Sequence, residues 1–290
     1  MPPISHILVP VDFSERCLAM MPYVRTIAGH YRADVTLLHV VNPVYAIPET
    51  GLSAPVLVPV PQWVFKEKSE QLERFAVSEL MDLSVRRLVY EGDPETQIAA
   101  FTRTEDVHLV VIPTHGYGVL RRYLIGSITA KVLDDVRCPV LTGTQAEAPV
   151  SLAEGKLSHV VCAIDLGPRS ADTLAWAFRL AQDFGARLSL VHVIPSISPG
   201  LYVTFTSRLK QEWEEIARKD VEKLQREAGI KGVSICIQEG DVPRAVCSFA
   251  HSIGADLLVV GRGAHVGGGG RLRTNAYAII RQADCAVLSV

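Results

Sequence analysis

The feature that most limits the folds open to this chain is an internal repeat. Four landmarks of the first half recur in the same order about 150 residues later. Each landmark and its recurrence are His6–Asp12 and His159–Asp165, Leu38–Val41 and Leu190–Ile194, Glu91–Asp93 and Glu239–Asp241, and Cys138–Leu141 and Cys285–Leu288. A chain of 290 residues suits two ordinary domains. We therefore predict a duplicated domain, with copies over residues 1–146 and 156–290.

Short apolar runs alternate with helical patterns in each copy. The strands expected in the first copy cover residues 6–12, 35–41, 85–90, 109–112 and 139–142. The helices expected between and after them cover residues 14–30, 63–82, 94–105 and 127–135. Strands that alternate with helices favour a parallel sheet covered by helices on both faces. The sequence thus predicts an α/β fold with five strands in each copy.

Three stretches carry more specific expectations. Ser14 is placed to cap the first helix, and Pro22 should kink that helix or break one of its hydrogen bonds. Residues 42–62 hold five prolines and read as a long loop of the kind that serves as a lid or an interaction surface. In the second copy, residues 207–228 form the clearest helical pattern. Its expected apolar face consists of Leu209, Trp213, Ile216, Ala217, Val221 and Leu224.

Composition excludes several classes of function. The formal net charge is −2 and neither half carries a basic stripe, so no nucleic-acid partner is expected. No apolar run approaches the roughly 18 residues of a membrane span, and the first residues lack a signal-peptide pattern. The six cysteines form no C-x-x-C pair, which favours free thiols over disulfides. These observations predict a cytoplasmic location without membrane contact.

The stretch from Val110 to Ser127 carries the strongest indication of a binding site. An apolar run ends at Pro113, a loop with Gly116 and Gly118 follows, and Gly126 directly precedes a helical pattern. Backbone N–H groups in such a loop, together with a helix N-terminus, attract phosphate at the carboxyl edge of an α/β sheet. The alternative is a plain strand-to-helix connection that needs glycine for its turns.

Five motifs in order resemble the universal stress protein family in its tandem form. They are H-I-L-V-P-V-D-F-S, L-L-H-V-V, E-G-D-P, P-T-H-G followed nine residues later by G-S, and C-P-V-L. The resemblance covers nearly the whole chain. It implies two adenine nucleotide alpha-hydrolase-like domains, each an open parallel sheet with strand order 3-2-1-4-5, paired through their last strands. It also implies ATP binding in the part of the family that carries the pattern G-x2-G-x9-G-[S/T].

The first half keeps most of that pattern. Gly116 and Gly126-Ser127 match it, whereas Pro113 replaces its first glycine and removes one N–H. By resemblance, Asp12 faces the ribose or adenine and the Val40 backbone reads the adenine edge. The nucleotide-binding positions implied are Pro10, Asp12, Val40, Gly116, Gly118, Gly126, Ser127 and Ile128. The alternative for Asp12 is a carboxylate that caps the turn after its strand.

The second half keeps less of the family's nucleotide-binding pattern. Asp165 and Val193 hold the base-side positions, and an alignment from the Cys285 ending places Gly263 opposite Gly116. The same alignment places Arg273-Thr274 opposite Gly126-Ser127. An arginine there either binds phosphate or fills its place, and the second interpretation is favoured. A second site at Asp165, Val193, Gly263 and Thr274 stays open, and about one nucleotide per chain is expected.

These observations lead to one functional hypothesis and two rivals. The hypothesis is a stress-response protein that binds ATP or a related adenine nucleotide, with or without Mg²⁺, in its first domain and acts as a nucleotide-dependent switch or scaffold. The rivals are a nucleotide-free interaction scaffold and a slow ATPase or autophosphorylating protein. No P-loop, catalytic set or metal-ligand cluster stands out, and His39 and His192 are interpreted as core residues. The protein partner is unknown. The two halves are expected to pair with each other within one chain, and further dimerisation of chains stays open.

Overall fold

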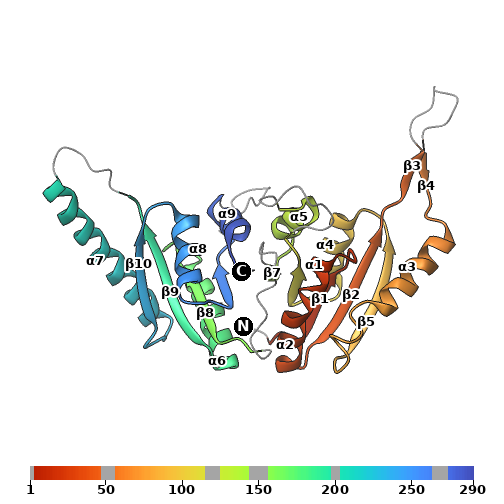
Figure 1. The fold of residues 1–290 in the computed structure, drawn as a ribbon, viewed down its shortest axis with the longest axis horizontal. Helices are drawn as coiled ribbons and strands as arrows, with labels where there is room; N and C mark the ends of the chain where they lie inside the picture. Colours follow the sequence, from red (N-terminus) through yellow and green to blue (C-terminus); the bar gives the residue numbers. More distant parts are fainter. Residues whose placement is uncertain (1–2, 47–55, 115–124, 144–155, 197–202, 263–273) are drawn as a thin grey trace. The chain divides into compact units, whose positions relative to one another are not determined.

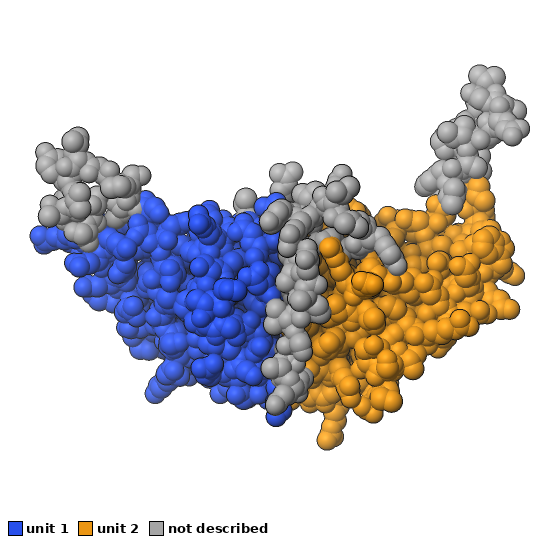
Figure 2. Space-filling view, in the orientation of Figure 1, with its two compact units in different colours: residues 1, 121–124, 141–290 blue, residues 2–120, 125–140 orange. Residues whose placement is uncertain are grey.

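The computed structural model describes residues 3–46, 56–114, 125–143, 156–196, 203–262 and 274–290. The chain divides into two compact units, one mainly of residues 2–120 and 125–140, the other mainly of residues 141–290 (Figure 2). We call the unit of residues 2–120 and 125–140 (orange) the first domain and the unit that contains residues 141–290 (blue) the second domain. The division agrees with the repeat in the sequence, although the boundaries 1–146 and 156–290 stay a prediction.

The first domain is built on a five-stranded sheet. Its strands are β1 (His6–Pro10), β2 (Asp34–Val41), β5 (Val85–Glu91), β6 (Leu109–Ile112) and β7 (Val140–Thr142). They lie in the order β5-β2-β1-β6-β7 (Figure 1). The β1–β2, β2–β5 and β1–β6 pairs are parallel. Numbered within the sheet, this is the order 3-2-1-4-5 that the resemblance implied.

The second domain repeats the arrangement. Its strands are β8 (His159–Ala163), β9 (Arg187–Ile194), β10 (Ser234–Glu239), β11 (Leu257–Val260) and β12 (Ala286–Ser289), in the order β10-β9-β8-β11-β12. All four neighbouring pairs are parallel. Parallel sheets are stable when helices cover both faces, which explains why β6 and β11 are apolar and buried at every position.

Helices cover both sheets. In the first domain they are α1 (Glu15–Leu18), α2 (Met21–Tyr31), α3 (Gln62–Arg74), α4 (Pro94–Thr104) and α5 (Ser127–Asp135). In the second domain they are α6 (Ser170–Phe184), α7 (Val203–Glu227), α8 (Val242–Ser252) and α9 (Thr274–Gln282). The E-G-D motifs start two of them, since Asp93 and Asp241 accept hydrogen bonds from the N–H groups of Thr96 and Arg244.

The first helix differs from its prediction. Ser14 does cap it, because the Ser14 side chain accepts a hydrogen bond from the Cys17 N–H at 3.1 Å. The expected single kinked helix is instead two helices, α1 and α2, interrupted at Ala19 and Met20. Pro22 lies in the first turn of α2, where its missing N–H costs no helical hydrogen bond.

Two predicted segments around α3 are also revised. The loop expected over residues 42–62 contains a two-stranded antiparallel sheet of β3 (Val44–Ala46) and β4 (Val56–Val58), with residues 47–55 outside the described part. The helix expected up to Asp82 ends at Arg74. The Arg87 side chain donates hydrogen bonds to the carbonyls of Leu72 and Phe75, which stabilises that helix end.

The apolar face predicted for α7 is only partly buried. Ala217 and Val221 are buried, but Trp213 is 39% exposed and Ile216 is 56% exposed. The stripe that contacts the sheet is therefore narrower than the sequence indicated.

Three expectations from composition concern the cysteines, membrane-spanning helices and the location of the protein. All six cysteines are free, as predicted, and burial raises the pKa of the Cys17 thiol to about 12. Within the described ranges, no helix is both long and apolar enough to cross a bilayer. The cytoplasmic location stays a prediction.

Candidate functional site

In each sheet there is one position from which the connections between strands run toward opposite edges of the sheet. In the first domain β1 lies between β2 and β6, and in the second β8 lies between β9 and β11. Open α/β sheets bind ligands at the carboxyl ends of the strands at such a switch point. Asp12 follows β1 and Asp165 follows β8, so both candidate aspartates lie at this edge.

Asp12 is held in a tight turn. Its Oδ1 accepts hydrogen bonds from the Ser14 N–H at 3.0 Å and the Ser14 hydroxyl at 2.7 Å. Phe13 between them has a φ of 64°, a left-handed conformation that is uncommon for a bulky side chain. The turn-capping alternative considered for Asp12 is thus part of its role. Such strained turns concentrate at functional sites because the surrounding structure must hold them.

Asp165 repeats the same turn with a different partner. Its Oδ1 accepts hydrogen bonds from the Gly167 N–H at 2.8 Å and the Ser170 hydroxyl at 2.9 Å. Leu166, the counterpart of Phe13, has a φ of 56°. A Cβ on Gly167 would lie 2.9 Å from Asp165 Oδ1, so any other residue would force this hydrogen-bonded carboxylate to shift. Both domains therefore fix one carboxylate at the switch point.

A histidine on the neighbouring strand ties each turn to the sheet. His39 Nδ1 lies 2.8 Å from the Val11 carbonyl oxygen, and His192 Nδ1 lies 2.7 Å from the Ile164 carbonyl oxygen. A carbonyl oxygen only accepts, so Nδ1 carries the proton in both rings. Both histidines are half-buried rather than fully buried in the core, and His192 also lines the cavity described below.

His39 should make the first domain sensitive to mild acid. Burial lowers the pKa of His39 below 6.5, so the unfolded chain binds a proton that the folded chain excludes. Stability is then lost as the pH falls below about 6.5. We expect the melting temperature to fall between pH 7 and pH 5.5, and to fall less in His39→Gln. Equal pH dependence of the two proteins would contradict this role.

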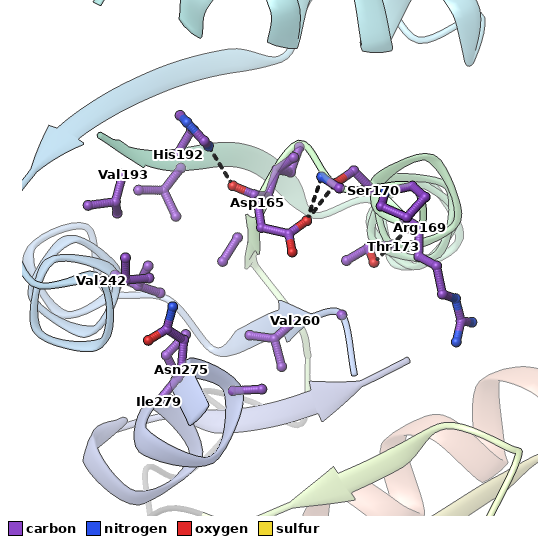
Figure 3. A pocket seen from close by; sticks show the side chains of 18 residues that line it. Asp165, Arg169, Ser170, Thr173, His192, Val193, Val242, Val260, Asn275 and Ile279 are labelled. Carbon is purple, nitrogen blue, oxygen red and sulfur yellow. Dashed lines mark hydrogen bonds between the residues drawn. The ribbon is translucent and has the colours of Figure 1, made fainter. Parts of the chain in front are cut away.

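A cavity of about 250 Å³ opens beside Asp165 (Figure 3). Its walls come from the ends of β8, β9 and β11 and from α6, α8 and α9. Aliphatic side chains form much of the lining, among them Val193, Val242, Val246, Val260 and Ile279. The polar side chains that line it include Asp165, Ser170, Thr173 and Asn275. Mostly apolar walls with a few fixed polar groups are typical of small-molecule sites.

The strand register revises the alignment of the two halves. Ile7 pairs with Leu109, and its counterpart Val160 pairs with Leu257. Four residues further on, Pro113 therefore corresponds to Gly261, and Gly263 corresponds to His115 rather than to Gly116. The second domain thus keeps the first glycine of the pattern, which the first domain has replaced. A Cβ on Gly261 would lie 2.8 Å from Thr173 Oγ1, so glycine lets this strand end approach α6.

The start of α5 is the phosphate-side candidate in the first domain. Gly126 is its N-cap residue, and no side chain caps the helix. The Gly126 N–H donates to the Thr114 carbonyl at 2.9 Å, so the N–H groups of Ser127 and Ile128 are those that begin the helix. The Thr129 hydroxyl donates to the Pro113 carbonyl at 2.9 Å and fixes the helix against the end of β6.

The other predicted residues are placed as follows. Pro10 ends β1 with its side chain buried, Val40 lies in β2, and Val193 lies in β9 and lines the cavity. Thr274 is the first residue of α9, as Ser127 is of α5. Gly116, Gly118 and Gly263 lie outside the described residues. Among the described residues, no three His, Cys, Asp or Glu side chains cluster as metal ligands.

Most of the residues that line the cavity were not among the predicted site residues. Gly167, Ser170, Thr173, Gly261 and Asn275 line it and were not singled out. The signal for Gly261 was available, since aligning the halves on their fourth strands, rather than from the Cys285 ending, places it opposite Pro113.

Comparisons with known proteins agree with this architecture. The model of the universal stress protein family matches residues 3–142 and again residues 156–290. Universal stress protein A homolog 1 of Coxiella burnetii is 34% identical over 137 residues, which are 46% of this chain and 94% of that protein.

Solved structures give the same fold over the whole chain. A universal stress protein from Archaeoglobus fulgidus is similar with a TM-score of 0.65 at 21% identity, over 98% of this chain and 95% of that one. A protein of unknown function from Pseudomonas aeruginosa gives a TM-score of 0.66 at 18% identity, over 99% and 92%. Since the family model matches twice and covers almost every residue, this chain belongs to the universal stress protein family, as a tandem member with two family domains.

Proposed function

We propose that this universal stress protein binds ATP or a related adenine nucleotide in its first domain and acts as a nucleotide-dependent switch or scaffold. One observation carries the proposal. A fixed carboxylate, Asp12, and a helix start without a side-chain cap, at Ser127, follow the two adjacent strands β1 and β6 at one edge of the sheet. A carboxylate suits ribose hydroxyls, and a helix start suits phosphate.

The helix start supports phosphate over other anions for geometric reasons. The N–H groups of Ser127 and Ile128 point out of the first turn of α5, where the helix dipole adds partial positive charge. Mg²⁺, if it accompanies ATP, would be held largely by the phosphates, since the described residues form no carboxylate cluster for it.

Pro113 favours a second candidate, a scaffold without nucleotide. Its ring removes an N–H at the first position of the family pattern, and its carbonyl already accepts a hydrogen bond from Thr129.

Mass spectrometry of the gently purified protein, under conditions that keep ligands bound, separates the two candidates. We expect an adenine nucleotide to accompany the protein, and calorimetry to give ATP binding that Asp12→Ala weakens. A preparation that holds no nucleotide and binds no added ATP would favour the scaffold.

The switch proposal also requires that ATP persists. We expect labelled ATP to stay intact for hours at high protein concentration, because hydrolysis would end the nucleotide-bound state on which a switch depends. Steady release of ADP or transfer of label to the protein would instead favour the slow ATPase or autophosphorylating protein.

A further inference from the structure

We propose that Phe13 couples the turn formed by Asp12, Phe13 and Ser14 (the Asp12 turn) to α3, so that the order of α3 depends on the state of that turn. The inference rests on the proposed function and deepens it, because a nucleotide-dependent switch requires an element that changes when nucleotide binds. It names α3 as that element and Phe13 as the positioning residue through which α3 responds.

Few buried side chains hold α3 to its sheet. Leu72 is the one buried residue among its 13, all of which the structure describes, whereas α2 buries five of its 11 residues. The helix packs on β2 and β5. Elements with few buried apolar contacts open locally at a low cost in free energy. Additional contacts can therefore change how often α3 opens.

The Phe13 ring supplies such contacts. Its centroid lies 5.8 Å from that of Phe75, the C-cap residue of α3, with the two rings nearly perpendicular. Lys68 Nζ, from the middle of α3, lies 5.6 Å from the Phe13 centroid. On the sheet side, the Phe13 centroid lies 4.5 Å from that of His39 in β2. Edge-to-face pairs and cation–π contacts stabilise beyond apolar burial, so the ring joins α3 to β2.

The position of this ring depends on the Asp12 turn. Phe13 has a φ of 64°, a left-handed conformation that costs free energy for a bulky residue. The two hydrogen bonds from Ser14 to Asp12 Oδ1 hold the turn around it. Release of the carboxylate would let the Phe13 backbone relax and withdraw the ring from α3. A ribose hydroxyl that donates to the Asp12 carboxylate would instead hold the turn, and with it the ring, more firmly.

The second domain has the turn without the ring. Leu166 stands at the position of Phe13 with a φ of 56°, and it has no aromatic face to offer to α7, the helix that corresponds to α3. The coupling is therefore expected in the first domain alone. This difference makes α7 an internal control within the same chain.

Hydrogen exchange followed by mass spectrometry, on the full chain freed of co-purified nucleotide, measures the opening of α3. We expect saturating ATP to slow the exchange of α3 amides by about fivefold or more and to leave α7 unchanged. The uncoupled variant combines Phe75→Leu with Lys68→Met, which removes both contacts between α3 and Phe13. In this variant the slowing should disappear. Calorimetry should still give an ATP dissociation constant within about twofold of the unmodified chain, because α3 is already ordered in most ligand-free chains.

A second arm of the experiment needs no nucleotide. Asp12→Ala removes the carboxylate that accepts both hydrogen bonds from Ser14, so it should speed the exchange of α3 amides by about fivefold. In the uncoupled variant the same substitution should add nothing. This double-mutant cycle separates coupling through Phe13 from a general loosening of the domain.

Phe101→Leu is the matched control. Phe101 is buried on α4 of the same domain, and its ring contacts His6 and Tyr90. The substitution should lower stability but keep the response of α3 to ATP. Slowing of α3 exchange that persists in the uncoupled variant, α3 exchange that ignores Asp12→Ala, or a response lost equally in Phe101→Leu would each overturn the inference.

The two proposals fail separately. If calorimetry shows ATP binding but α3 exchange does not respond to ATP, the inference falls and the proposed function stands. If no ATP binds, while Asp12→Ala speeds α3 exchange only when Phe75 and Lys68 are intact, the proposed function falls and the inference stands.

Discussion

Gly126→Glu is expected to weaken ATP binding by at least tenfold, a loss of about 1.4 kcal/mol. The substitution sets a carboxylate at the helix start where the phosphates are proposed to lie, and like charges repel strongly in a partly desolvated site. Gly126 has a φ of −60° and a ψ of 149°, which any residue adopts, so the backbone should tolerate the change. The expected result is therefore a binding defect in a folded protein, measured by calorimetry with ATP and AMP.

A comparison of ligands with different charge identifies the cause of the weaker binding. Repulsion grows with the charge on the phosphates, so Gly126→Glu should penalise ATP more than AMP, whereas Asp12→Ala should penalise both alike. Gly29→Glu is the matched control, because Gly29 lies exposed on α2 with nothing within 4 Å of an added Cβ. ATP affinity that survives Gly126→Glu in a folded chain would mean that the glycines between Val110 and Ser127 serve only the turn.

Leu8→Ala is expected to destabilise the first domain by about 3 kcal/mol. Leu8 is fully buried in β1, the strand between β2 and β6, where it pairs with Thr36 and Val110. The neighbours cannot collapse into the space left by the truncated side chain, because both flanking strands are fixed by their own hydrogen bonds. Chemical denaturation followed by circular dichroism measures the loss.

Leu18→Ala provides the comparison for this substitution. Leu18 ends the short helix α1 and is 37% exposed, so the same truncation should cost well under 1 kcal/mol. Similar losses in the two variants would show that β1 is not the centre of the packed core.

Much of the candidate site could be predicted because it depends on local sequence. A buried strand followed by aspartate places a carboxylate at the carboxyl edge of a parallel sheet wherever the rest of the chain lies. Ser14 as a helix cap is equally local, since its hydroxyl reaches the N–H of Cys17 three residues on. The predictions failed where the packing of a helix against the sheet determines which of its side chains are buried. The predicted α7 face included Trp213 and Ile216, and only contact with β9 and β10 shows which part of a helix stripe is covered.

The amino-acid sequence alone revealed the duplication, the alternation of strands and helices, the two aspartates and the family. Periodicity and the order of short motifs encode these features directly, because none of them requires knowing which distant residues come into contact. The three-dimensional packing was needed to show which half carries the described cavity and which glycine lines it. Gly261 meets Thr173, and Asp165 faces Val242 and Ile279 across the cavity, through pairing of β8 with β11 and packing of α8 and α9. Loops of unequal length hide that register in the sequence, whereas strand hydrogen bonds fix it to the residue.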